Sequence, residues 1–198
     1  MVEKNEQHII ACDLDGTLIN SDLLHESFWS AFSSNWKIPF KCMHWLIAGK
    51  TYLKKKLFEN SDINVNSLPY NQTVIDYVRN SRQRGNRTVL ITASNQKLAE
   101  KIAAHLGLFD EVYGSSLQQN LKGKSKARFL CEKYGEGNFD YIGDSLADLP
   151  VWRKAKKAIT NTENKFIRNE VEKKVFKFEH LKTKNFGLIE YFIALRPH

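Results

Sequence analysis

One stretch near the start of the chain limits its fold more than any other: HIIACDLDGTL, residues 8–18. The apolar run 9–12 predicts a buried strand of a parallel sheet, and Gly16 allows a sharp turn just beyond it. Asp13 and Asp15 would then lie at the carboxyl edge of the sheet, where open α/β folds bind ligands. Two carboxylates so close repel each other and therefore favour a divalent cation, although a strand followed by an Asx turn is the simpler alternative.

Beyond residue 85 the chain alternates between strand and helix patterns. We expect strands at 88–92, 111–113, 139–142, 157–160 and 175–178, and helices at 95–106, 123–134 and 147–155. Such alternation predicts an α/β fold in which helices cover both faces of a parallel sheet.

Residues 21–69 do not follow this alternation of strands and helices. We expect one helix at 21–36, with Ser21 or Asp22 as its cap, a second helix at 40–58, and a polar loop at 60–69. The prediction is therefore a core made of residues 1–20 and 70–198, with a helical cap, residues 21–69, lying over the strand ends.

The formal net charge of +8 is compatible with binding to nucleic acid or to an anionic membrane. However, the lysines and arginines are spread along the whole chain without a nucleic-acid-binding motif, so we expect no nucleic-acid partner. No apolar run is long enough to span a bilayer, and residues 1–7 are polar. Three widely spaced cysteines without a zinc pattern suit a reducing compartment, so we expect a cytoplasmic protein.

Two further segments have features of a phosphate site. In Thr92-Ala93-Ser94 a buried strand ends in hydroxyl and small residues before a helix, where free backbone N–H groups suit a phosphate, although a plain N-cap is the alternative. Lysines stand at the start of the next helix, where the helix dipole disfavours cations. A nearby phosphate would explain them, but for Lys124 and Lys126 we favour a solvated basic turn.

The segment 141–148 joins a strand to a turn that carries two more acids, Asp144 and Asp148. Asp144, at the strand end, can reach a metal ion shared with Asp13, and Asp148 can support it from the next turn. An N-cap accounts for one of these acids but not for both together with Asp13 and Asp15.

In this order, Asp13-Leu14-Asp15-Gly16-Thr17-Leu18, Thr92, a lysine, and Gly143-Asp144-Ser145 with Asp148 resemble the four motifs of the haloacid dehalogenase superfamily. The resemblance implies a Rossmannoid core, Mg²⁺, and phosphoryl transfer through an aspartyl-phosphate intermediate.

On this basis Asp13 would be the nucleophile, and Asp15 would act as general acid and then general base. Mg²⁺ would be held by Asp13, the Asp15 carbonyl and Asp144, with Asp148 as a supporting or water-mediated partner. Thr92, the N–H groups after it at Ala93 and Ser94, and a lysine would hold the phosphate oxygens.

The lysine has two candidates. In the phosphoserine-phosphatase-like branch it directly precedes a glycine, so we predict Lys122, which precedes Gly123, with Lys124 as the alternative. That branch often has asparagine where this chain has Ala147, which leaves Asp148 alone to support the last motif.

A closer resemblance extends to about residue 161. Segments 13–18, 21–24, 68–71, 103–110, 120–123 and 148–152 are similar to a bacterial subgroup often fused to membrane prenyltransferases of the UbiA type. This implies a sugar phosphate or a lipid-linked (polyprenyl) sugar phosphate as substrate. The alternatives are a phosphotransferase or phosphomutase with the same site, and a non-catalytic partner of a membrane prenyltransferase.

The cap combines aromatic and cationic residues, as membrane-surface segments do. The alternative, which we favour, is that the aromatics pack the cap helices together and onto the core. The aromatics are Phe28, Trp29, Phe32, Trp36, Phe40 and Trp45, and the cations are Lys50, Lys54, Lys55 and Lys56.

Overall fold

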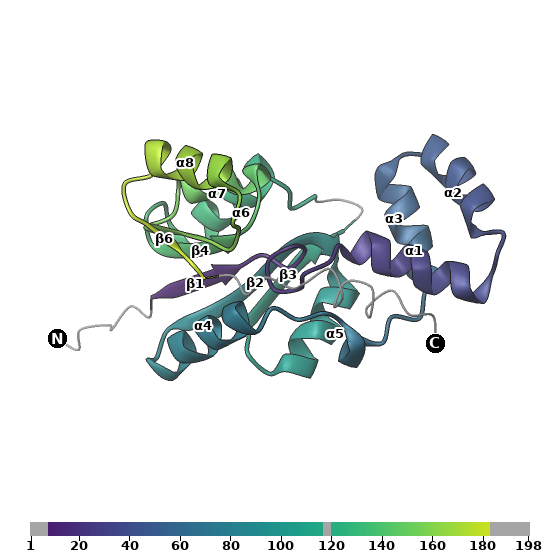
Figure 1. Ribbon diagram of the computed structural model, residues 1–198, viewed down its shortest axis with the longest axis horizontal. Helices are drawn as coiled ribbons and strands as arrows, with labels where there is room; N and C mark the ends of the chain where they lie inside the picture. Colours follow the sequence, from purple (N-terminus) through teal and green to yellow (C-terminus); the bar gives the residue numbers. More distant parts are fainter. Residues whose placement is uncertain (1–7, 117–119, 183–198) are drawn as a thin grey trace.

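The computed structural model describes residues 8–116 and 120–182, and it contains one six-stranded parallel sheet with strand order β3-β2-β1-β4-β5-β6 (Figure 1). The first strand of the chain lies in the middle, so its carboxyl end is flanked by those of β2 and β4. The strands are β1 (Ile9–Cys12), β2 (Arg87–Asn95), β3 (Glu111–Ser115), β4 (Phe139–Gly143), β5 (Lys157–Thr160) and β6 (Phe178–His180). The predicted α/β fold with a parallel sheet is confirmed.

Helices cover both faces of the sheet (Figure 1). One face packs against α4 (Gln72–Gln83) and α5 (Gln96–Leu106), and the other against α6 (Lys124–Tyr134), α7 (Leu149–Trp152) and α8 (Lys165–Lys174). Successive residues of β1 alternate between these two hydrophobic clusters, with Ile10 and Cys12 in the first and Ile9 and Ala11 in the second. Both faces of the strand are therefore buried, which explains its uninterrupted apolar sequence.

Between β1 and α4 the chain forms three further helices, α1 (Leu23–Ser34), α2 (Ile38–Ile47) and α3 (Lys50–Glu59), and a 3₁₀ turn, η1 (Val65–Ser67). Asp22 caps α1, because its side chain accepts a hydrogen bond from the Leu24 backbone N–H. The three helices bury a small cluster of their own, made of Ala31, Ile38, Trp45 and Leu57.

Three predicted elements have different bounds. The single helix expected at 40–58 is wrong, because the chain breaks at Gly49, whose φ of 106° is unfavourable for other residues. The helix expected at 147–155 is reduced to a 3₁₀ turn, η2 (Leu146–Asp148), and the short α7. The last strand lies at 178–180 and not at 175–178, because Val175 is the C-cap of α8.

Every helix within residues 8–116 and 120–182 is too short or too polar to cross a membrane.

Leu90→Ala is expected to lower the free energy of unfolding by about 2–5 kcal/mol, because it opens a cavity at the centre of β2. Leu90 is fully buried beside β1, paired in register with Cys12. Chemical denaturation of the two proteins measures the difference. Leu146→Ala is the matched control, since Leu146 is 44% exposed and its loss should change stability by about 0.5 kcal/mol or less. Equal effects of the two substitutions would contradict this placement of the core.

Candidate active site

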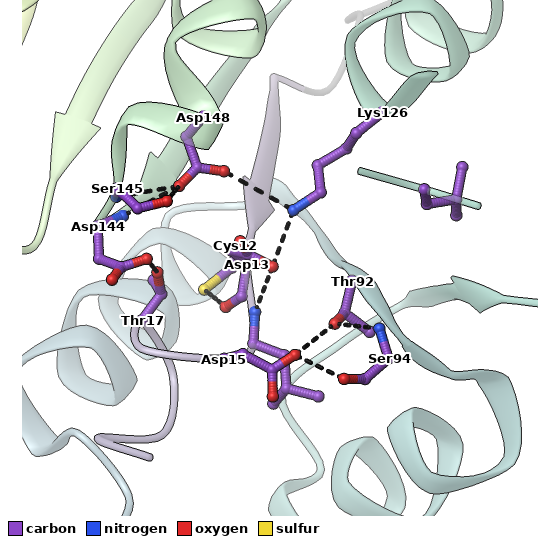
Figure 2. A network of polar contacts seen from close by, with 12 residues as sticks. Cys12, Asp13, Asp15, Thr17, Thr92, Ser94, Lys126, Asp144, Ser145 and Asp148 are labelled. Atoms are coloured by element: carbon purple, nitrogen blue, oxygen red, sulfur yellow. Dashed lines mark hydrogen bonds and ion pairs between the residues drawn. The ribbon is translucent and has the colours of Figure 1, made fainter. Parts of the chain in front are cut away.

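Three neighbouring strand ends bring the predicted acids and hydroxyls together (Figure 2). Cys12, the last residue of β1, is in register with Leu90 of β2 and Ile142 of β4. Asp13 therefore emerges between the end of β4, which leads to Asp144, and the part of β2 that leads to Thr92. This arrangement follows from parallel pairing, because the carboxyl ends of parallel strands meet at one edge.

Asp13 is fixed by its backbone and by one carboxylate oxygen. Its N–H donates to the Ile142 carbonyl at 2.9 Å, while Oδ1 accepts from the Leu14 N–H at 2.8 Å and lies 2.8 Å from Lys126 Nζ. Burial raises the pKa of Asp13, and Lys126 opposes that shift. Among the described residues these contacts use Oδ1 and leave Oδ2 for a ligand.

The lysine that contacts Asp13 is Lys126, whereas Lys122 and Lys124 are exposed. The expectation that Lys126 belongs to a solvated turn was wrong, since it is only 3% exposed. Burial lowers the pKa of Lys126, but the attraction of Asp13 and Asp148 outweighs it, so that the pKa rises. The charged form is thus favoured in a buried position.

A signal for Lys126 was present in the sequence. Helix α6 begins at Lys124, and its buried residues are Lys126, Ala127 and Leu130. Lys126 and Leu130 are four residues apart, so they share one face of the helix. Apolar periodicity therefore marks this lysine as facing the core, whereas the Lys-Gly pattern selected its exposed neighbour.

Asp148 is held at both carboxylate oxygens. Oδ1 accepts from the Tyr141 hydroxyl at 2.7 Å, and that hydroxyl accepts from Lys126 Nζ at 2.8 Å. Oδ2 accepts from the backbone N–H groups of Asp144 and Ser145 at 3.3 and 3.2 Å, and from the Ser145 hydroxyl at 3.2 Å. Asp148 therefore orients Lys126 and the turn that carries Asp144 (Figure 2). Tyr141 is a member of the site that the sequence patterns did not single out.

Asp144 lies close to the turn after β1. Its Oδ1 accepts from the Thr17 hydroxyl at 3.2 Å, and burial raises its pKa to about 6. Gly16, with φ of 72°, lies so close to Asp144 that a Cβ atom added to it would be 2.4 Å from Asp144 Oδ2. Glycine is thus required at this position both for the turn and for the space it leaves the carboxylate.

Asp15 points away from these acids and toward the end of β2 (Figure 2). Its Oδ2 accepts from the hydroxyls of Ser94 at 2.6 Å and Thr92 at 3.2 Å, and Oδ1 accepts from the Leu23 N–H at 2.8 Å. Burial raises the pKa of Asp15, although these hydrogen bonds oppose the shift. Thr92 and Ser94, predicted to bind phosphate, are therefore hydrogen-bonded to Asp15. Ala93, between them in β2, supplies the backbone of the same strand end.

One group of carboxylates could hold a metal ion. Asp13, Asp144 and Asp148 each offer an oxygen, and these oxygens lie within 4.8 Å of one another. Carboxylate oxygens suit a hard divalent cation such as Mg²⁺. Because both oxygens of Asp148 are already hydrogen-bonded, Asp13 and Asp144 are the better direct ligands. The Asp15 carboxylate is not in this group. This agrees with the expected roles, in which the Asp13 carboxylate binds the cation and the Asp15 carboxylate transfers protons.

Residues 62–153 match the model of the family described as haloacid dehalogenase-like hydrolase. The chain is also 41% identical over 150 residues to the uncharacterized protein y4nM of Sinorhizobium fredii. That match covers 76% of this chain but only 29% of the relative, which is therefore much longer.

Solved structures share the fold. A substrate-bound phosphoserine phosphatase has a TM-score of 0.59 and 14% identity, with 95% of this chain and 99% of that chain covered. A HAD family hydrolase from Salmonella enterica serovar Typhi has a TM-score of 0.62 and 16% identity, with 96% and 72% covered. A protein of unknown function from Bordetella pertussis has a TM-score of 0.63 and 14% identity, with 87% and 97% covered.

Proposed function

We propose that the chain is a haloacid dehalogenase-like, Mg²⁺-dependent phosphatase that hydrolyses a phosphomonoester through a phosphorylated Asp13; the family match over residues 62–153 and the fold shared with phosphoserine phosphatase support this. One observation carries the proposal. The Asp13 carboxylate lies 2.8 Å from a buried lysine and within 4.8 Å of the oxygens of Asp144 and Asp148, while its second oxygen makes no hydrogen bond to the described residues. A carboxylate in this position can contact a bound phosphate and a cation at the same time.

The residues fit the cation. Asp13 and Asp144 would hold it, and Asp148 would keep the Asp144 turn and Lys126 in place. When bound, Mg²⁺ would neutralise charge on the phosphate oxygens and lower the repulsion between phosphate and carboxylate. Burial and the negative charge of Asp148 raise the pKa of Asp144, although Lys126 and the Thr17 hydroxyl oppose the shift, and a divalent cation at this position would favour the charged carboxylate.

Two steps complete the reaction. First, Asp13 Oδ2 attacks phosphorus, the bond from phosphorus to the leaving oxygen breaks, and that oxygen takes a proton from Asp15. Second, Asp15 takes a proton from water, whose oxygen attacks phosphorus and releases Asp13 and inorganic phosphate. The raised pKa of Asp15 favours the protonated form that the first step needs, and Ser94 and Thr92 hold that carboxyl in position.

Lys126 would bind the phosphate oxygens as charge develops on them, together with the Thr92 hydroxyl and the N–H groups of Ala93 and Ser94. The Ser94 N–H now donates to Thr92 Oγ1 at 3.0 Å, so that substrate would replace this contact. Lys126 already contacts Oδ1 of Asp13, so its charge lies beside the carboxylate whose other oxygen, Oδ2, would attack phosphorus.

The leaving group would occupy a small cavity between the inserted helices and the end of β2. Ser94 both lines this cavity and binds Asp15, so the cavity adjoins the proposed acid. Its lining is otherwise mostly apolar, with one cation, Lys54. The cavity has room for about one water molecule, so only the part of the alcohol nearest the phosphate would enter it. Its lining supports an alcohol that carries both apolar and anionic or hydroxylated parts, including a sugar phosphate or a lipid-linked sugar phosphate. The lining residues are Leu23, Leu24, Ser27, Lys54, Phe58, Ser94, Asn95 and Leu98.

The wild type is expected to hydrolyse p-nitrophenyl phosphate with Mg²⁺ and to lose this activity in EDTA. Asp144→Asn should raise the Mg²⁺ concentration needed for half-maximal activity by about tenfold or more, because one charged ligand is lost. The Mg²⁺-induced rise in melting temperature should shrink in parallel, which separates cation binding from catalysis. Asp62→Asn is the control, since Asp62 is not part of the acidic group. Full activity in EDTA would overturn the metal-dependent mechanism.

The alcohol can be tested separately with a set of phosphomonoesters that includes sugar phosphates and a lipid-linked sugar phosphate. Lys54→Met should raise KM for the preferred substrate while leaving turnover of p-nitrophenyl phosphate nearly unchanged, because that compound carries no second anionic group. An equal loss with both substrates would contradict the assignment of this cavity to the leaving group.

A further inference from the structure

The outer face of α2 is apolar and exposed. Helix α2 lies at the end of the inserted helices that is farthest from the sheet, and it packs against α1 and α3 (Figure 1). Four large side chains on or just before it are open to solvent: Trp36 is 68% exposed, Phe40 67%, Met43 71% and Ile47 86%. The prediction that the aromatics of this segment pack the helices together holds for Phe28 and Trp45. It is wrong for Trp29, Trp36 and Phe40, each of which is more than half exposed.

Phe40, Met43 and Ile47 share one face of α2, because their positions repeat at helical spacing. Trp36, just before the helix, extends this stripe, since its ring lies edge-on to that of Phe40. The opposite face of the helix carries Ile38 and Trp45, which are buried in the cluster shared with α1 and α3. Helix α2 is thus apolar on two faces, and only one of them is explained by packing within the described residues. A contiguous exposed apolar stripe of this kind marks an interaction surface.

The charges beside the stripe have one sign. No Asp or Glu occurs between Glu26 and Glu59, whereas this interval contains six lysines. Lys37, Lys41 and His44 follow the stripe along one side of α2, and they are exposed. The other lysines, Lys50, Lys54, Lys55 and Lys56, lie on α3, where Lys55 and Lys56 pair with Glu59.

We propose that this face of α2 binds an anionic lipid surface. A bilayer with acidic headgroups supplies negative charge for the lysines next to an apolar interior for the stripe, which is the combination that interfacial helices use. A second copy of the chain would instead bring two acid-free, lysine-rich faces together, so charge disfavours self-association through α2. The proposal rests on this surface alone and is independent of the phosphatase reaction.

Binding can be measured by sedimentation with vesicles of equimolar phosphatidylcholine and phosphatidylglycerol, and with vesicles of phosphatidylcholine alone. The protein should sediment with the anionic vesicles only, and high salt should release it. Phe40→Ser and Met43→Ser should each weaken binding by about tenfold or more, because each removes a large apolar side chain from the interface. Lys37→Gln and Lys41→Gln should each weaken it by about fivefold.

Phe176→Ser is the matched control, because Phe176 is 96% exposed and stands near Lys174 and Lys177 but lies outside α2. It should leave vesicle binding unchanged. All substituted side chains are exposed, so circular dichroism should show wild-type melting for each variant. Equal binding to neutral vesicles, no binding to anionic vesicles, or an equal loss with Phe176→Ser would overturn the proposal. A dimer in solution that Phe40→Ser dissociates would also overturn it, since a second copy would then be the occupant.

Discussion

Asp13→Asn is expected to lower kcat for p-nitrophenyl phosphate by at least about 10³-fold, because the substitution removes the proposed nucleophile. Asparagine has nearly the same shape, and its side-chain oxygen can still accept the hydrogen bond from the Leu14 N–H. The negative charge that Lys126 contacts is lost, however, together with one ligand of the proposed cation. Steady-state kinetics at saturating Mg²⁺ measures the effect on turnover.

The control for this variant is Asp76→Asn. Asp76 is an exposed acid on α4 that pairs with Arg79 and is not part of the acidic group at the strand ends. Its substitution should change kcat by less than about twofold. Rapid acid quenching with labelled substrate adds an independent measurement, because the wild type should carry phosphate on the protein and Asp13→Asn should carry none. A variant that retains turnover within tenfold of the wild type would exclude Asp13 as an obligatory nucleophile.

Sequence reasoning located the acids because their positions depend on backbone topology. A buried strand that ends in Asp13 and another that ends in Asp144 must converge once the sheet is parallel and the two strands are neighbours, as β1 and β4 are. Thr92 follows from the same rule on the other side, through the pairing of β1 with β2. Local residue patterns suffice for such sites, since no side-chain packing has to be known.

The lysine could not be found in the same way. Lys122, Lys124 and Lys126 stand within one short segment, and the choice among them depends on where α6 begins and which face it buries. Gly123 has a φ of 53° and shifts the start of the helix to Lys124, which turns Lys126 toward the sheet. The division of the predicted helix at 40–58 into α2 and α3 has a similar cause, a single glycine whose backbone conformation the apolar pattern does not reveal.

Lys126→Met is the second substitution with a large expected effect. It should lower kcat by about 10²–10³-fold, because a buried cation that stabilises the phosphate oxygens in the transition state is lost. Lys122→Met and Lys124→Met are matched controls on the same segment. Both side chains are exposed, so each should change kcat by less than about twofold. Steady-state kinetics of the three variants gives the ranking, and a larger loss with Lys122→Met would show that the lysine nearest Asp13 is not the one that acts on substrate.

The free energy of unfolding tests the ion pair of Lys126 separately from its role in catalysis. Lys126 is buried between Asp13 and Asp148, so its removal leaves two carboxylates without their counter-charge and should cost about 3–5 kcal/mol in the absence of divalent cation. Asp13→Asn added to Lys126→Met should recover part of that loss, because one of the unpaired charges disappears. Mg²⁺ should likewise stabilise Lys126→Met more than the wild type, since the cation takes over the missing positive charge. If neither change recovers stability, the ion pair between Lys126 and Asp13 does not hold this edge of the sheet together.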